Sequence, residues 1–365
     1  MVSDRALDLA VAQHIITAEQ ASRLRTLDAA DSDADAERLR FVSGFGDIFV
    51  ALGIGLFLVP AGLIADIYGG DLVRWLTIAA LAWLLAEFFT RKRRMALPSI
   101  VLLVVFMTSS FETARVFLER AAIIRAAPAT AQLFRNEIAG PIGVSSLWDW
   151  SLHPGSMLAA ALITVVLGVF HYWRFRVPIT IAAGTAALCL AVVAGARLAF
   201  PDLPAVAIRG LILVCGVLVF LLAMRFDMSD LTRVTRRTDI AFWLHLLAAP
   251  LIVHPLIGAI SHGSESLDMA QALETLLVFL GLGAVAVLID RRALLVSGLA
   301  YAGFALLAII RQAGLTDMQA PMTALALGAF VLAISAFWRP LRSAFLRRLP
   351  AWLAERVPHP VVVST

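Results

Sequence analysis

Charge, lysine and cysteine are all scarce in this 365-residue chain. Charged residues make up 15% of it and hydrophobic residues 61%, whereas soluble globular proteins carry about 25% and about 45–50%. This composition excludes a water-soluble enzyme, a disordered chain and a fibrous repeat. The two cysteines, Cys189 and Cys215, lie inside apolar runs and are too few for a disulfide framework. We expect them to behave as small buried hydrophobic residues.

The chain contains instead a series of apolar runs, and a helix needs about 20 such residues to cross a bilayer. The mean hydropathy of +0.88 agrees with this pattern. The predicted fold is all-α, a polytopic transmembrane helix bundle of about ten spans that occupies residues 41–338. The ten expected spans are Ile48–Ala65, Trp75–Phe89, Met95–Phe111, Met157–Trp173, Val177–Ala196, Gly210–Met224, Ile240–Ile260, Leu276–Ile289, Ala293–Ile310 and Pro321–Trp338.

The distribution of basic residues predicts how the chain is oriented. If the N-terminus is cytoplasmic, 22 of the 30 Lys and Arg residues fall on the cytoplasmic side and 8 on the other side. Cytoplasmic loops of membrane proteins carry an excess of Lys and Arg. The strong preference for Arg and Ala indicates a bacterial source. We therefore predict a multi-pass protein of the bacterial inner (cytoplasmic) membrane with both termini in the cytoplasm.

The N-terminal residues predict a small cytoplasmic helical hairpin at 1–30, followed by an acidic linker at 31–40. Thr17 and Gln20 have the spacing of a capping box that starts the second helix of the hairpin. A DNA-binding helix-turn-helix is disfavoured because residues 1–40 carry eight acids against five arginines, and phosphate binding needs the opposite charge. We therefore expect the hairpin to contact protein, and no nucleic acid partner.

Two further segments are distinct from the spans. Residues 112–154 form the long outside loop, and its first part, 112–126, is either an interfacial amphipathic helix or an extension of the third span. Residues 339–365 alternate Arg with Leu, Phe and Trp. This pattern predicts a basic amphipathic cytoplasmic tail that lies on the anionic inner leaflet.

Four features between residues 5 and 110 occur together: the hairpin sequence Ile15–Leu24, the linker end Glu37–Phe41, the glycine-bearing first span Ala51–Phe57, and Trp83 and Glu87 before the basic turn Arg91–Arg94. With these features the segment resembles a large family of uncharacterised bacterial membrane proteins. The family is described as a "predicted membrane protein" with a domain of unknown function, in which an N-terminal helical hairpin precedes multiple transmembrane helices. The resemblance implies no activity, cofactor or catalytic residue.

Ionisable residues inside membrane helices are functional candidates, because each costs a few kcal/mol to insert. The candidates for a polar, substrate-contacting or proton-relay role are His245, His254, Asp239 and Glu87. The two histidines are nine residues apart, about 900° around a helix, so they point to opposite faces and do not share a metal ion. No metal site and no cofactor is predicted. Neutral histidines that bond neighbouring helices are the alternative interpretation.

Structural roles compete with functional ones at other charged positions. Glu87 is spaced to pair with Arg91 at i, i+4. His171, beside Tyr172 and Trp173 near the end of a span, is expected at the membrane interface. In the charged loop 225–239, three arginines are candidates for binding an anion or a lipid headgroup, or alternatively for a self-paired turn: Arg233, Arg236 and Arg237.

These observations predict an integral inner-membrane protein that is transporter-like and not an enzyme, with the lipid bilayer as its surroundings. One alternative is a membrane scaffold or assembly factor that contacts protein partners through residues 1–30 and loop 112–154. A second alternative is an intramembrane enzyme that uses His245 or His254.

Overall fold

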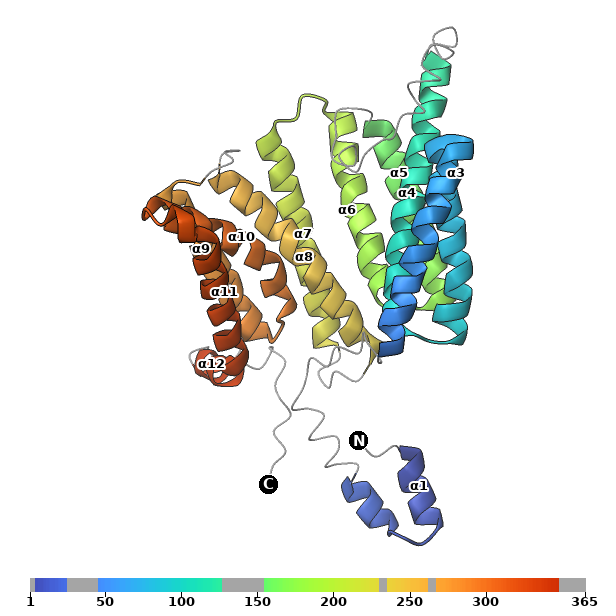
Figure 1. The fold of residues 1–365 in the computed structure, drawn as a ribbon, viewed down its shortest axis with the longest axis vertical. Coiled ribbons are helices and arrows are strands. Elements are labelled where there is room, and N and C mark those ends of the chain that lie inside the picture. The colour runs from blue at the N-terminus through green and yellow to red at the C-terminus, as the bar shows by residue number, and fades with distance from the viewer. Residues whose placement is uncertain (1–3, 25–44, 127–153, 230–234, 262–266, 348–365) are drawn as a thin grey trace.

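The structure is a computed structural model that describes residues 4–24, 45–126, 154–229, 235–261 and 267–347. Every regular element within these residues is a helix, which confirms the predicted all-α bundle (Figure 1). Nine of the described helices are long and apolar enough to cross a membrane. The chain is therefore a multi-pass integral membrane protein in contact with the lipid bilayer.

The described helices coincide with the predicted spans to within a few residues at most ends. The membrane helices are α3 (Phe45–Ala86, continued by the π-helix η1, Glu87–Lys92), α4 (Ala96–Ala126), α5 (Pro154–Phe175), α6 (Ile179–Ala199), α7 (Ala205–Met228), α8 (Arg236–Ile260), α9 (Met269–Ile289), α10 (Ala293–Gln312) and α11 (Gln319–Ala336). Two short helices lie outside this set, α1 (Asp4–Ala12) and α12 (Trp338–Leu346).

Helix α3 is a pair of antiparallel spans and not one long rod (Figure 1). A straight helix of its 42 residues would measure about 63 Å, twice the hydrocarbon thickness of about 30 Å. The chain reverses at Gly70, whose φ of 67° costs glycine nothing. Two contacts are symmetric about Gly70, as a hairpin requires: Asp66 with Arg74 at 3.6 Å, and Gly62 against Ile78. Counted this way, the described helices make ten crossings, the number predicted.

Helix α4 decides between the two interpretations of residues 112–126. It runs without a break from Ala96 to Ala126, so this segment extends the third span and is not a separate interfacial helix. At 31 residues the helix is about 46 Å long, and its last turns therefore project beyond the hydrocarbon. The rest of the predicted outside loop, 127–153, lies outside the described residues.

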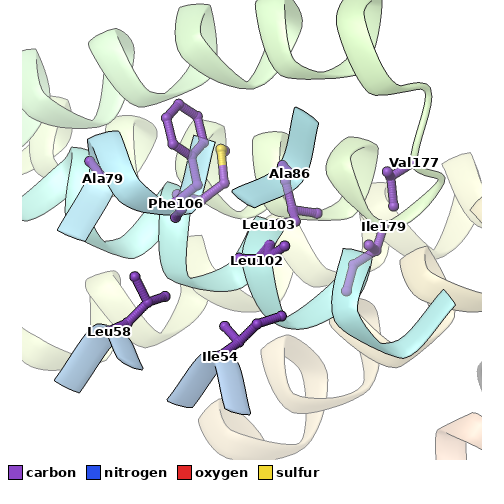
Figure 2. Packing of buried hydrophobic residues seen from close by; sticks show 11 residues of the cluster. Ile54, Leu58, Ala79, Ala86, Leu102, Leu103, Phe106, Val177 and Ile179 are labelled. Atoms are coloured by element: carbon purple, nitrogen blue, oxygen red, sulfur yellow. The ribbon is translucent and has the colours of Figure 1, made fainter. Parts of the chain in front are cut away.

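The membrane helices form two groups along the chain, α3–α6 and α7–α12 (Figure 1). In the first group each helix packs mainly on the next one, and in the second group α8 and α10 are the central helices. Helix α6 joins the groups, mainly through α8. Figure 2 shows part of the core of the first group, where Ile54 and Leu58 of α3 lie beside Leu102 of α4, while Phe106 of the same buried cluster points away from them. Many large apolar side chains remain exposed, as lipid-facing residues do.

The N-terminal residues 4–24 contain α1 and a second helix at 18–24. The Thr17 N–H donates to Gln20 Oε1 at 2.9 Å, and the Gln20 N–H donates to Thr17 Oγ1 at 3.2 Å. These two hydrogen bonds confirm the predicted capping box. Leu7 of α1 and Ala21 of the second helix are both buried. The predicted acidic linker 31–40 lies outside the described residues.

Candidate functional site

Three ionisable side chains from three separate segments meet at the end of the bundle where α12 lies (Figure 1). Asp227 belongs to the last turn of α7, His245 to α8, and Arg291 to the turn between α9 and α10. Each of the three is at most 3% exposed. We call Asp227, His245 and Arg291 the buried triad.

The carboxylate of Asp227 is the centre of the triad. Its Oδ2 accepts hydrogen bonds from His245 Nε2 at 2.9 Å and from Arg291 Nε at 3.1 Å, and its Oδ1 accepts from Arg291 Nη2. Arg291 therefore binds both carboxylate oxygens in the planar two-point geometry that favours an ion pair. Because an ionised carboxylate only accepts, Nε2 of His245 carries a hydrogen in either protonation state. Nδ1 is consequently the atom that gains or loses a proton.

The charges of the triad depend on one another. Asp227 and Arg291 form a neutral pair in surroundings that include the ring of Phe220, 5.4 Å from the His245 ring. A proton on His245 would add one positive charge to this buried cluster. Buried charges are tolerated only when they are paired and hydrogen-bonded, and losing one partner costs about 3–5 kcal/mol. The triad is therefore suited to one of two roles. It can bind a proton at His245, or it can act as a structural link between α7, α8 and the α9–α10 turn.

A second polar cluster is centred on Asp290, the residue that precedes Arg291 of the triad in the sequence. Asp290 ends α9 in the left-handed conformation, with φ 59° and ψ 48°. Its Oδ1 accepts a hydrogen bond from Trp338 Nε1 at 2.8 Å, and its Oδ2 lies 3.3 Å from Arg342 Nη1. The guanidinium of Arg292 lies over the Trp338 ring at 5.0 Å. These contacts attach α12 to the turn that carries Arg291. The sequence predicted that Trp338 would end the last span, but in the structure the span ends at Ala336 and Trp338 begins α12.

The predicted site residues on α8 occupy different surroundings. His245 belongs to the buried triad, whereas His254 is exposed and its Nδ1 lies 2.8 Å from the Tyr301 hydroxyl on α10. The two histidines thus contact different helices, as the nine-residue spacing predicts. Asp239 is half-buried in the first turn of α8. The structure therefore does not bring the four predicted residues into one site.

Glu87 has the predicted partner and a second one. Arg91 Nη1 lies 3.3 Å from Glu87 Oε2, which confirms the i, i+4 pair. Arg174, at the end of α5, binds both carboxylate oxygens through Nε and Nη2, each at 2.8 Å. Glu87 therefore fastens α5 to η1, a structural role. The sequence could not indicate Arg174, which is 87 residues away.

The predicted charged loop 225–239 is much shorter in the structure. Helix α7 continues through Asp227 to Met228, because Arg291 neutralises the carboxylate and allows the helix end to be buried. Arg236 and Arg237 are exposed in the first turn of α8, where Thr235 Oγ1 accepts a hydrogen bond from the Arg237 N–H at 3.3 Å. Arg233, the third predicted anion ligand, lies outside the described residues.

The prediction that His171 lies at the membrane interface is wrong. Its side chain is 1% exposed and is surrounded by the rings of Trp83, Phe106 and Phe175, at centroid distances of 5.9, 5.5 and 4.6 Å. Its Nδ1 lies 3.3 Å from Thr180 Oγ1, across the tight turn into α6. Phe175 lies on the same helix, α5, but Trp83 comes from α3 and Phe106 from α4, and local sequence patterns do not reveal these two neighbours.

The sequence analysis missed Asp227 and Arg291, and a usable signal was present. Asp227 follows an uncharged run of α7 by a single turn, and Arg291 occupies the three-residue turn 290–292 between apolar spans. An acid and an arginine placed at the ends of spans on the same side of a membrane are suited to pair. A search for acid–arginine pairs between the ends of different spans, and not only within one helix, would have indicated both residues.

No family model matches the chain, and neither a curated protein nor a solved structure matches it. The resemblance of residues 5–110 therefore stays a prediction, as do the scaffold and enzyme alternatives. Within the part of the chain that the structure describes, no group of three or more His, Cys, Asp or Glu side chains is placed to hold a metal ion. The fold defines the class of protein, a multi-pass membrane protein built of helices.

Proposed function

We propose that this protein is a transporter-like protein of the bacterial inner membrane and that the buried triad is its proton-binding centre. The observation that carries the proposal is the joint burial of Asp227 and His245, on two membrane helices, with Arg291, in the turn between two others. Ionisable groups at such positions are costly, and they commonly mark proton relays or substrate pathways. Imidazole is the side chain whose charge changes near neutral pH.

A proton on Nδ1 of His245 would change how strongly the helices are joined. Asp227 would then share its negative charge between two cations, and its pairing with Arg291 would weaken. That pairing ties α7 to the α9–α10 turn. Helix α8 can respond because Pro250 and Pro255 each remove a backbone hydrogen bond beyond His245. Proton binding is therefore coupled to the arrangement of α7, α8 and α10.

The experiment is a pH jump applied to proteoliposomes on a solid-supported membrane, which records the charge displaced when a protein binds protons. Wild-type protein is expected to give a transient current. His245→Gln, which keeps a hydrogen-bonding side chain but takes up no proton, should abolish that current. Asp227→Asn should reduce it because the carboxylate no longer stabilises the imidazolium.

His171→Gln is the matched control, since His171 is an equally buried histidine in the other helix group. It is expected to leave the current unchanged. Monodispersity and melting temperature are compared for all variants, so that loss of fold is recognised. A current of wild-type size in folded His245→Gln would contradict the proposal, and so would the absence of any current in the wild-type protein.

A further inference from the structure

The start of α7 and the end of α8 lie at the opposite end of the second helix group from α12 (Figure 1), and a second group of polar side chains lies near them. It consists of Arg209 on α7, His254 on α8 and Tyr301 on α10. We propose that these three side chains bind a phosphate group, carried by a phospholipid of the adjacent leaflet. This site is separate from the buried triad and does not depend on the function proposed for it.

The first observation is the pairing of His254 with Tyr301. His254 is exposed although it belongs to a membrane-spanning helix, and its Nδ1 lies 2.8 Å from the Tyr301 hydroxyl. The contact with Tyr301 orients the ring and leaves Nε2 as its second hydrogen-bonding atom. An exposed, oriented imidazole at the membrane surface is suited to a polar ligand and not to acyl chains.

The second observation is the path of the Arg209 side chain. A Cβ atom at Gly258 would lie 3.3 Å from Arg209 Cδ, so the arginine crosses α8 at this glycine. Gly258 follows His254 by four residues and thus lies on the same face of α8. The absence of a side chain at Gly258 lets the arginine from α7 approach the helix surface that carries His254. A guanidinium offers planar pairs of N–H donors that match phosphate oxygens.

The third observation is the position of the site near the end of α8, together with the exposed apolar side chains next to it. His254 precedes the end of α8 by six residues, about 9 Å along the helix axis, so it lies toward one end of the span and not at its centre. Val206, three residues before Arg209, is 69% exposed, and Phe304, three residues after Tyr301, is 63% exposed. Polar groups beside exposed apolar side chains fit a ligand that has both a phosphate and acyl chains.

The test measures binding of phosphatidylglycerol to the purified full-length protein by native mass spectrometry. Wild-type protein should retain the lipid. Arg209→Gln should weaken binding about tenfold, as expected for loss of a charge-assisted hydrogen bond. Gly258→Val should weaken it as well, because the new side chain displaces Arg209 while every polar atom of the site remains. Tyr301→Phe removes the contact that orients His254 and should have a smaller effect.

Arg311→Gln is the matched control, since Arg311 is an exposed arginine in the last turn of α10. It should retain wild-type binding. Competition with inorganic phosphate distinguishes the sources: displacement of the lipid indicates a site for free phosphate, and no displacement indicates a lipid site. The proposal is overturned if Arg209→Gln binds as Arg311→Gln does, or if wild-type protein binds neither ligand. If Gly258→Val does not fold, the lipid binding of Arg209→Gln and His254→Gln tests the proposal in its place.

Discussion

Asp290 and Arg291 are neighbours in the chain, yet their side chains bind partners on different helices. Arg291 pairs with Asp227 inside the bundle, whereas Asp290 pairs with Trp338 and Arg342 of α12. The left-handed conformation of Asp290 makes this divergence possible. One three-residue turn thus connects the buried triad to a short helix at the end of the bundle.

The ion pair between Asp227 and Arg291 is expected to show strong energetic coupling. Asp227→Leu leaves Arg291 as an unpaired buried cation, and Arg291→Met leaves the carboxylate unpaired, so each should cost about 3–5 kcal/mol. The double variant removes both charges and should be more stable than either single variant. Thermal unfolding of the four proteins in detergent measures this coupling, and additive losses would show that the two residues do not act as a pair.

Helix α12 should detach when its contact with Asp290 is lost. Trp338→Phe keeps an aromatic side chain, though a smaller one, and removes the indole N–H that donates to Asp290, a loss of about 1 kcal/mol for the hydrogen bond. Amide hydrogen exchange across residues 338–346 should then become faster. Arg347→Gln is the control, because Arg347 is exposed just beyond α12, and it should leave exchange unchanged. Equal exchange in Trp338→Phe and wild type would mean that this hydrogen bond does not hold α12.

The close packing of α7 on α8 should depend on Gly216. A Cβ atom there would lie 2.9 Å from the backbone carbonyl carbon of Leu251, so Gly216→Ala forces the two helices apart. Overpacking of this kind costs about 1–3 kcal/mol. Gly210→Ala, on the same helix with nothing within 4 Å, is the matched control and should be neutral or stabilising. Melting temperatures of the two variants compare these effects, and equal values would contradict the packing argument.

The predicted orientation can be tested by chemical labelling in intact cells. Ser145→Cys, in the predicted outside loop, should react with a membrane-impermeant maleimide added externally. Ser32→Cys, in the predicted cytoplasmic linker, should react only after the cells are opened. The native Cys215 is buried and Cys189 half-buried, so the protein without a new cysteine serves as the background. Labelling of Ser32→Cys from outside would reverse the assigned orientation.

Hydropathy in the sequence was sufficient to predict the fold class, the number of crossings and most helix boundaries. The reason is that lipid requires every span to satisfy its own backbone hydrogen bonds, so each span can be identified from its own residues. The capping box at Thr17 and Gln20 and the pair between Glu87 and Arg91 were predictable for a different reason, the short distance along the chain. Their partners lie three or four residues apart in one helix.

Tertiary structure alone decided which polar residues meet. Asp227 and Arg291 are 64 residues apart, and Asp290 and Trp338 are 48 apart. The sequence predicted His245 as a candidate site residue, but its carboxylate partner, Asp227, came from another helix. Local patterns report the face of a helix on which a side chain lies, and they do not report which helix packs against that face. The packing of one span on another, and with it the site, follows from the side chains of the whole bundle.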